Sequence, residues 1–536
     1  METREFDYIV VGAGSAGCAV AARLAQDRKT TVLLLEAGPR DRNMWIHIPI
    51  GYGKTMFNPQ LNWQFESEPE PNLDNRKIYI PRGRTLGGSS SINGLVYIRG
   101  QKEDFERWRA AGNVGWGWDD VLPYFKRSEA NERGADACHG GDGPLAVSDI
   151  RGRHPLIEAI IGGANELGVP RTDDFNGARQ EGAGYFQLTT RNGLRCSAAK
   201  AYLRSGIAGA NLCVESDAQA TGVILEGRRA VGVSYLRGGR ACQARARCEV
   251  VLSAGAIQSP QLLMLSGIGD ADALRALGIA PAHHLPEVGH NLQDHLQSRL
   301  MYRCTRPITT NDALRTWWGT ARIGLQWILR RAGPVAAGIQ LGGMFARTND
   351  SEQTPNVQFH FGTISADMTA GKPHDFPGFT LSVCQLRPTS RGRLDLASPD
   401  PLAAPRARFN YLDTEFDRRT MIEGVRMARQ LVRTRSLAPY VADEYRPGFN
   451  VESDDEVLRF IRGYATTIFH PVGTCRMGPD TASVVDNRLR VRGVDRLRVV
   501  DASIMPLLLS GNTNAGSIVI GEKGADMIME DREKIS

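Results

Sequence analysis

A glycine-rich turn near the N-terminus constrains the fold of this chain more than any other feature. Gly12, Gly14 and Gly17 follow the apolar, β-branched run Asp7–Val11 and precede the apolar stretch Cys18–Gln26. A buried strand, a glycine turn and a helix in this order predict the first part of a dinucleotide-binding βαβ unit. Such a turn needs one glycine to tighten it, one to approach a pyrophosphate and one to pack helix against strand.

The segment after the helix supports this interpretation. Thr31–Glu36 predicts a second buried strand that ends on an acidic residue, about 20 residues beyond the turn. Glu36 can accept hydrogen bonds from ribose hydroxyls, and the N-terminus of the preceding helix offers unpaired N–H groups to phosphates. We therefore expect a nucleotide cofactor here; a glycine-rich turn in an unrelated α/β protein is the alternative.

Size and composition limit the class of protein. A chain of 536 residues exceeds one simple core, so we expect two to four domains. An apolar share of 42% and a charged share of 23% are typical of a soluble globular protein. The net charge of +6 is small and its charges are interspersed, which argues against nucleic-acid binding.

The cellular location is predicted from what the sequence lacks. No apolar stretch reaches the roughly 18 residues of a transmembrane helix, and no signal-like segment precedes the first strand. The nine cysteines are scattered without a CxxC pair, as in a reducing compartment, and no His, Cys and carboxylate cluster has metal-ligand spacing. We expect a cytoplasmic protein without a metal.

Further elements follow from periodicity. Residues 345–455 alternate apolar and polar side chains, which predicts a sheet with one exposed face; Val357, Phe359 and Phe361, Thr380–Leu386, and Arg393–Leu396 carry this pattern. The other expected elements are strands at Ala218–Leu225, Val250–Ala254 and Leu497–Val500, and helices at Ile257–Leu265 and about 515–530.

Several long segments resemble the glucose–methanol–choline (GMC) oxidoreductase family. Arg82–Arg99 and Gly255–Gly269 resemble its two signature sequences, and Val288–His295, His470–Gly478 and Leu497–Asp526 match in the same order. The resemblance spans residues 6 to 530 and is nearest to the choline-dehydrogenase-like and alcohol-dehydrogenase-like branch. It implies an enzyme that binds FAD and oxidises a primary alcohol to the aldehyde by hydride transfer to flavin N5.

The resemblance also implies an α/β fold, α+β overall, with two domains. A Rossmann-type FAD-binding domain would be discontinuous, and a substrate-binding domain would carry a mostly antiparallel sheet backed by helices. We assign residues 1–155, 191–305 and 456–536 to the first domain, and residues 156–190 and 306–455 to the second.

The cofactor contacts expected from the turn and the resemblance are mostly small residues. Small side chains let the backbone approach a flat ring or a diphosphate, while hydroxyls and N–H groups satisfy its acceptors. The expected set is Gly12, Gly14, Ser15, Ala16, Gly17, Glu36, Ala37, Arg82, Gly83, Gly87, Gly88, Ser89, Asn93, Gly94, Val96, Ala220, Asp501, Ala502, Asn512 and Thr513. Some family oxidases carry a flavin-linked histidine where this chain has Ile92, so we expect non-covalent FAD.

His470 and Asn512 are the expected catalytic residues. Alcohol oxidation needs a base for the hydroxyl proton and a donor to the substrate oxygen, and a neutral imidazole suits the base. His470 opens the family motif that positions this base. Asn512 occupies a family position held by His or Asn, and its amide can donate but cannot titrate. The N-terminus of the final helix would face the flavin and stabilise its reduced, anionic form.

The remaining histidines receive weaker interpretations. His290 and His295 belong to a family motif near the FAD without an obvious chemical role. His360 lies on an alternating strand, and we interpret it as a packed sheet residue rather than a pocket residue.

The substrate and the electron acceptor are less constrained. Asp367, Phe359, Phe361 and Trp63 are candidates for holding a trimethylammonium group, but acids and aromatics are abundant elsewhere. We predict a quinone-type, dye-like or other non-oxygen acceptor. Choline dehydrogenase proper, an oxygen-using alcohol oxidase and a non-redox hydroxynitrile-lyase-type flavoprotein are the alternatives, and the sequence does not indicate an oligomeric state.

Residues 313–333 predict a helix with an apolar stripe and arginines around it. The stripe comprises Leu314, Trp317, Trp318, Ala321, Leu325 and Ile328. A peripheral contact with the inner membrane surface, giving access to quinone, is one interpretation. A helix that covers the active site or lies in a dimer contact is the other, and it is the one we favour for such stripes.

Overall fold

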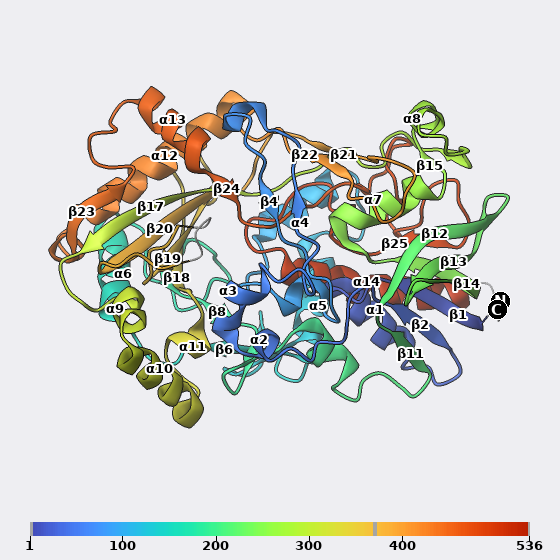
Figure 1. Ribbon diagram of the computed structural model, residues 1–536, viewed down its shortest axis with the longest axis horizontal. Coiled ribbons are helices and arrows are strands. Elements are labelled where there is room, and N and C mark those ends of the chain that lie inside the picture. Colours follow the sequence, from blue (N-terminus) through green and yellow to red (C-terminus); the bar gives the residue numbers. More distant parts are fainter. Residues whose placement is uncertain (1–3, 368–371, 534–536) are drawn as a thin grey trace.

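The computed structural model describes residues 4–367 and 372–533, which form two lobes (Figure 1). Each lobe contains a seven-stranded sheet. The lobe with β1 (Arg4–Val11) and β2 (Val32–Leu35) lies at the right of Figure 1, and the lobe with β17 (Leu296–Cys304) and β20 (Gly378–Gln385) lies at the left.

The first sheet is the expected dinucleotide-binding core. β1 pairs in parallel with β2 on one side and with β14 (Arg240–Leu252) on the other, and β14 pairs in parallel with β25 (Leu497–Val499). Its parallel strands are apolar because helices cover them, as expected for parallel sheets. The sheet is completed by β11 (Leu212–Glu215), β12 (Ala218–Glu226) and β13 (Arg229–Arg237), in the order β11-β2-β1-β14-β13-β12.

Helices that approach this sheet hold the predicted turn in place. α1 (Ser15–Leu24) begins directly after the turn and packs against α14 (Asn514–Glu533), so the first and last helices of the chain are neighbours. α7 (Gly255–Leu265) follows β14. The predicted helices and strands are therefore confirmed here, although β14 begins ten residues earlier than expected.

The second sheet is antiparallel, as predicted. Its order is β23-β17-β20-β19-β18-β7, and β24 (Thr466–Thr467) also pairs with β17. α12 (Glu415–Val432) packs on it, with contacts to β20 and to α6 (Pro155–Glu166). The remaining strands are β7 (Gly182–Tyr185), β18 (Gln340–Ala346), β19 (Val357–Gly362) and β23 (Val441–Arg446).

One expectation about this sheet is wrong: its polar face is not exposed. Every residue of β19 and β20 is buried. Val357 and Val383 face Gly424 of α12, so the alternating polar residues of β19 point to the opposite side, where a pocket lies. Arg393–Leu396 was also misplaced, because β21 (Arg393–Asp395) pairs with β22 (Arg406–Arg408) in a separate hairpin.

The division into domains stays a prediction, and the pairing of one strand bears on the predicted boundary at residue 305. β17 lies within the segment 191–305 that we assigned to the FAD-binding domain, yet it pairs with β20 and β23 of the second sheet. A division at residue 305 separates β17 from these partners, whereas a division before Leu296 would keep them together. A parallel apolar strand and a buried antiparallel strand look alike in sequence, and only the pairing distinguishes them.

The predicted amphipathic helix forms two helices with an exposed apolar surface. α9 (Thr310–Arg315) and α10 (Trp317–Arg330) are separated by Thr316, whose side chain accepts a hydrogen bond from the Gly319 N–H. Within α10 only Ile323 is buried. The stripe therefore does not cover the active site. No helix among the described residues is long and apolar enough to cross a membrane.

Candidate active site

A single cavity of about 450 Å³ runs from the glycine turn of the first sheet to the polar face of the second. It brings together most of the residues that the sequence predicted. His470, Asn512, Gly12, Gly14, Ser15, Ala16, Glu36, Ala37, Arg82, Gly83, Gly88, Ser89, Asn93, Gly94, Val96, Ala220, Asp501, Ala502 and Thr513 line it. Gly17 and Gly87 do not; they lie behind the wall of the cavity.

The glycines of the turn have the separate roles expected of them. Gly12 has φ +100°, and a Cβ there would lie 2.5 Å from the Ser253 carbonyl oxygen. A Cβ on Gly17 would lie 1.9 Å from the Gly12 carbonyl oxygen, so Gly17 serves helix packing rather than ligand contact. Gly14 has only Ser253 within 4 Å, at 3.9 Å, and therefore opens its backbone to the cavity.

The predicted loop after Arg82 seals the turn from the other side. The Gly87 N–H donates to the Ala13 carbonyl oxygen over 2.7 Å. Gly87 has φ +89°, a backbone conformation that favours glycine, although it does not face the cavity. A Cβ on Gly88 would lie 2.7 Å from the Gly14 Cα. Only glycines allow two loops to meet this closely beside a ligand.

Glu36 ends β2 in the wall of the cavity. Its carboxylate accepts hydrogen bonds from the Ala13 and Gly38 N–H groups at 3.0 and 2.9 Å. Burial raises its pKa to about 7, because a desolvated carboxylate is costly to ionise. A ribose hydroxyl could donate to the remaining lone pairs, as expected for this position.

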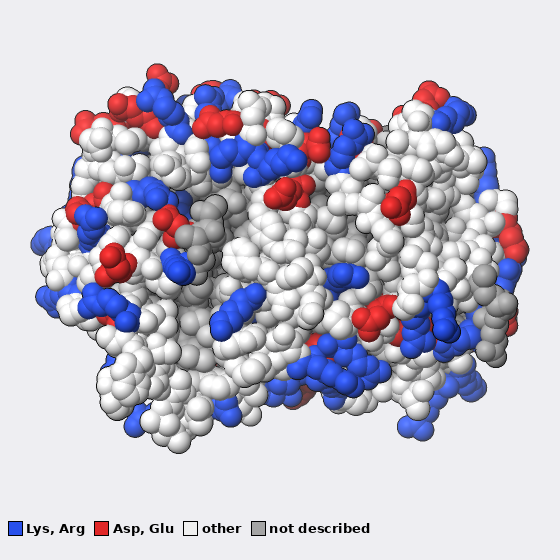
Figure 2. Space-filling view, in the orientation of Figure 1, with Lys and Arg blue, Asp and Glu red and all other residues white. Residues whose placement is uncertain are grey.

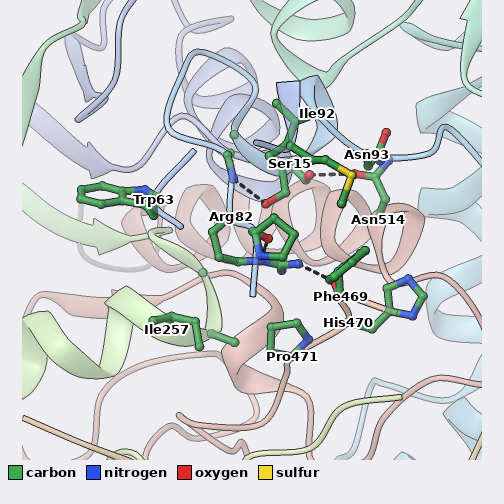
Figure 3. A pocket seen from close by; sticks show the side chains of 18 of the residues that line it. Ser15, Trp63, Arg82, Ile92, Asn93, Ile257, Phe469, His470, Pro471 and Asn514 are labelled. Atoms are coloured by element: carbon green, nitrogen blue, oxygen red, sulfur yellow. Dashed lines mark hydrogen bonds between the residues drawn. The ribbon is translucent and has the colours of Figure 1, made fainter. Parts of the chain in front are cut away.

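These residues fit an elongated dinucleotide. The open backbone at Gly14 meets the N-terminus of α1, and the N-terminus of α14 contributes Asn514 and Ser517 to the same cavity. The Ser15 hydroxyl donates to Asn514 Oδ1 over 2.7 Å, which joins the two helix starts (Figure 3). Two helix N-termini and a strand-end carboxylate match the phosphates and the ribose of such a cofactor.

His470 lies at the other end of the cavity and is held in one tautomer. His295 Nε2 lies 2.9 Å from the Leu386 carbonyl oxygen, which can only accept, so His295 carries its proton on Nε2. His295 Nδ1 is then an acceptor, and it lies 2.9 Å from His470 Nδ1. His470 must therefore be protonated on Nδ1, which leaves the lone pair of its Nε2 available.

Asn512 completes this arrangement. Its Nδ2 lies 3.3 Å from His470 Nε2, and its Oδ1 accepts a hydrogen bond from Gln358 Nε2 over 3.4 Å. Because Gln358 holds the carbonyl oxygen of Asn512, the amide N–H groups are directed at His470 and the cavity. An oxygen bound between His470 Nε2 and Asn512 Nδ2 would meet one acceptor and one donor.

The loop that carries His470 is anchored from two sides. The His470 N–H donates to Asp294 Oδ1 over 2.7 Å, and Thr467 and Tyr411 donate to the other oxygen of Asp294. Arg82 donates to the Phe469 carbonyl oxygen (Figure 3). Phe469 has φ +73°, a strained conformation for a bulky residue, and such strain is typical of functional sites.

Burial keeps the histidines of the cavity neutral. It lowers the pKa of His470 well below its usual value, and the neighbouring His295, His360 and Arg82 act in the same direction. Burial also lowers the pKa of His295 to about 4. A neutral His470 is the form that can accept a proton. Among residues 4–367 and 372–533, no group of three metal-ligating side chains is placed to hold a metal.

The sequence missed three contributors to this site. His295 orients His470, Gln358 orients Asn512, and His360 lines the cavity instead of being a packed sheet residue. Gln358 and His360 are the polar residues in the alternating pattern of β19, so the sequence did place them on one face of the strand. Sequence periodicity does not distinguish a face in water from a face that lines a cavity. For His295 the position within a motif was the only signal.

The first sheet and its cavity define a class: an α/β protein that binds a dinucleotide beside a histidine and an asparagine. Comparison with known proteins makes this specific. Residues 6–297 and 388–521 match the sequence profiles of GMC oxidoreductases, and the first match alone covers more than half of the chain. The chain belongs to the GMC oxidoreductase family, and its cofactor is FAD.

Relatives and solved structures agree with this assignment over the whole chain. An alcohol dehydrogenase [acceptor] of Pseudomonas putida is 45% identical, covering 98% of this chain and 96% of that protein. The mitochondrial choline dehydrogenase of Mus musculus is 44% identical, covering 98% and 89%. The crystal structure of pyridoxine 4-oxidase from Mesorbium loti is 30% identical with a TM-score of 0.89, covering 98% and 99%. A formate oxidase structure from Aspergillus oryzae is 27% identical with a TM-score of 0.93, and covers 100% of both chains.

Proposed function

We propose that this protein oxidises a primary alcohol to the aldehyde, with His470 as the base and FAD as the first electron acceptor. The observation that carries the proposal is the tautomer of His470, whose unprotonated Nε2 lies 3.3 Å from Asn512 Nδ2 inside the cavity. The relatives named as alcohol and choline dehydrogenases support the choice of an alcohol.

Each residue of the pair has one task. His470 Nε2 accepts the hydroxyl proton, while Asn512 Nδ2 donates to the same oxygen and stabilises its developing negative charge. His295 and Gln358 keep both side chains in the required orientation, so no reorganisation is needed when the alcohol binds. FAD, when bound, supplies the group that accepts the hydride. The start of α14 would hold the FAD with its N–H groups.

We propose that the FAD is held without a covalent bond. The side chain at the position of the family's flavin-linked histidine is Ile92, a buried aliphatic residue in the cavity wall. A saturated side chain has no nucleophilic atom. Acid precipitation of the holoprotein should therefore leave FAD in the supernatant, and flavin that stays with the precipitate would contradict this proposal.

We further propose that electrons leave to a quinone-type acceptor at an anionic lipid surface, with the enzyme on the cytoplasmic side. The surface of α10 carries Trp317, Trp318, Leu325, Ile328 and Leu329, each at least 55% exposed. The two tryptophan rings stack at 3.7 Å. Arginines 315, 322, 330 and 331 surround them, and residues 313–333 contain no acid. This surface lies at the lower left of Figure 2, where acidic side chains are scarce. Cationic and aromatic side chains together suit an anionic membrane surface.

The central test is anaerobic mixing of the FAD-loaded protein with a primary alcohol. We expect the flavin absorbance to fall after mixing, because the alcohol reduces the FAD. His470→Ala should lose at least about 100-fold in the rate of this change while still binding FAD. His290→Ala is the control, since His290 is an exposed histidine that does not line the cavity. Near-normal reduction in His470→Ala would remove His470 from the base role.

The same experiment separates oxidation from a lyase. If alcohols leave the flavin absorbance unchanged and a cyanohydrin releases cyanide, the protein is a non-redox flavoprotein. Repeating the reduction with oxygen, a quinone and a dye distinguishes a dehydrogenase from an oxidase. Fast reoxidation by oxygen alone would contradict the proposed acceptor.

A further inference from the structure

The face of the second sheet that lines the cavity has a regular arrangement of polar residues. In the register of the sheet, Arg299 of β17 lies opposite Ser382 of β20, and Ser382 lies opposite His360 of β19. Residues directly opposite each other project from the same face. The neighbouring row contains Gln297 and Gln358, and Gln358 contacts Asn512. The row of Arg299, Ser382 and His360, here called the polar row, is therefore one step beyond the catalytic pair.

Each member of the polar row has a buried polar atom without a partner. Arg299 Nε, Ser382 Oγ and His360 Nδ1 are buried and make no hydrogen bond within the described chain. Ser382 and His360 are 1% and 3% exposed. Leaving one such atom unpaired in a protein costs about 1–3 kcal/mol. Because Arg299 and His360 both line the cavity, their unpaired atoms indicate a missing ligand.

The charge of Arg299 is also unbalanced. Burial lowers the pKa of its guanidinium, and no carboxylate of the described residues forms an ion pair with it. The nearby Tyr52 hydroxyl accepts from the Ile339 N–H over 3.3 Å and retains its own proton to donate. A guanidinium can only donate, and the hydroxyls and imidazole beside it can donate as well.

The carboxylates that line the cavity are already held. Asp367 accepts from Arg446 over 2.7 Å and lies near His374. Glu36 accepts from the Ala13 and Gly38 N–H groups, and Asp501 accepts from the Gly255 N–H and the Ser259 hydroxyl. Arg299 is thus the charge that a ligand would meet on the face of the second sheet.

From this geometry we infer that the polar row binds a carboxylate, so that the substrate is a hydroxy acid with its hydroxyl at His470 and its carboxylate at Arg299. This inference rests on the proposed function and names its substrate class. Gln297 and Arg299 are two residues apart along β17, so the carboxylate lies about 7 Å from the reacting end. A carboxylate would satisfy the guanidinium with two oxygens and accept from His360 and Tyr52, which line the cavity together with Arg299.

The same geometry argues against a trimethylammonium alcohol. Of the aromatic candidates from the sequence, Phe359 and Phe361 alternate with Gln358 and His360 and so lie on the other face of the sheet. Trp63 lies across Arg82 from His470 in Figure 3 and has the Arg84 guanidinium over its ring at 4.9 Å. Asp367 is neutralised by Arg446. Beside Arg299, a quaternary ammonium would lose its water next to an unpaired guanidinium, and the carboxylate of Asp367 is already paired.

The experiment compares matched ligands on the FAD-loaded protein. Hexanoate and hexanamide, which carry no hydroxyl to oxidise, are titrated while the flavin absorption spectrum is followed. ω-Hydroxyhexanoate and hexanol are compared as substrates by the anaerobic rate of flavin reduction. The variants are Arg299→Gln and Arg299→Lys. The control is Arg303→Gln, which removes a positive charge from the same strand at a side chain that is 45% exposed and paired with Asp443.

We expect the wild type to bind hexanoate about 10- to 100-fold more tightly than hexanamide. It should also oxidise ω-hydroxyhexanoate with a kcat/KM higher than that for hexanol by a similar factor. Arg299→Gln should abolish both preferences, Arg299→Lys should retain part of them, and Arg303→Gln should retain them fully. Oxidation of hexanol should change less than threefold in Arg303→Gln.

Equal binding of hexanoate and hexanamide by the wild type would overturn the inference, as would equal effects of Arg299→Gln and Arg303→Gln. The proposed function fails separately: if no alcohol reduces the flavin but hexanoate binding depends on Arg299, the carboxylate site stands and the alcohol oxidation does not. If hexanol is oxidised and ω-hydroxyhexanoate is not preferred, alcohol oxidation stands and the carboxylate site does not.

Discussion

The two sheets of this protein build their halves of the active site in different ways. The first sheet presents the turn at the centre of its ligand site from one contiguous stretch, in which β1, the turn at Gly12 and the start of α1 follow each other directly. The second sheet builds its polar row from β17, β20 and β19, and His360 and Ser382 lie 61 and 83 positions beyond Arg299 in the chain. A backbone site can therefore be recognised in a motif, whereas a side-chain site on a sheet depends on register.

The largest expected effect tests the contiguous half. Gly17→Val places a side chain where even a Cβ would lie 1.9 Å from the Gly12 carbonyl oxygen. We expect destabilisation of more than about 4 kcal/mol and loss of bound FAD, measured by urea unfolding and flavin absorbance. Gly324→Ala is the control, because its Cβ would meet nothing within 4 Å in the helix α10. A stable Gly17→Val holoprotein would show that the turn does not need this close packing.

The second prediction breaks the other half without touching the cofactor end. His295→Ala removes the acceptor that fixes the tautomer of His470. FAD should remain bound, while the rate of flavin reduction falls about 10- to 100-fold, less than the loss of the base itself. His295→Asn should restore part of the rate, since its amide oxygen can accept from His470 Nδ1. Equal losses in His295→Ala and His295→Asn would indicate a packing role for His295.

The third prediction concerns the pH dependence of flavin reduction, which distinguishes a buried His470 from an exposed one. The pKa of His470 is lowered from its ordinary value of 6.5, so its neutral, proton-accepting form persists as pH falls. The rate of flavin reduction should therefore stay level through pH 6.5 and decline only at lower pH. Stopped-flow reduction between pH 5 and pH 8 checks this. A rate that halves near 6.5 would show that His470 titrates as if it were exposed.

The smallest effect on catalysis is expected at α10, which lies outside both halves of the active site. Trp317→Gln combined with Leu325→Gln should weaken binding to phosphatidylglycerol vesicles about tenfold or more, while reduction by a soluble alcohol stays unchanged. Leu402→Gln is the control, since Leu402 is 57% exposed and Leu325 is 55% exposed. Vesicles of phosphatidylcholine alone should bind less. A wild-type dimer that the double variant dissociates, without vesicle binding, would instead make α10 a subunit contact.

The sequence by itself determined the first sheet, the glycine turn and the identity of the predicted pair. Local chemistry fixes these features: a glycine with φ +100° and a strand–turn–helix order are properties of neighbouring residues. The predicted base His470 and its partner Asn512 lie together because long motifs carried their positions. The alternation of β19 likewise indicated an antiparallel strand.

Only the tertiary structure decided what the polar faces do. The alternation in β19 was interpreted as a solvent-exposed face, but this face is buried: His360 lines the cavity and Gln358 contacts Asn512. His295 contacts His470 because loop packing brings together segments that are far apart in the chain. Arg299 has an unpaired Nε because of the position that strand pairing gives it. The apolar stripe of α10 is the opposite case: its pattern is typical of a buried face, but nothing in the described chain covers it. Periodicity specifies which side chains share a face, and packing specifies what that face meets.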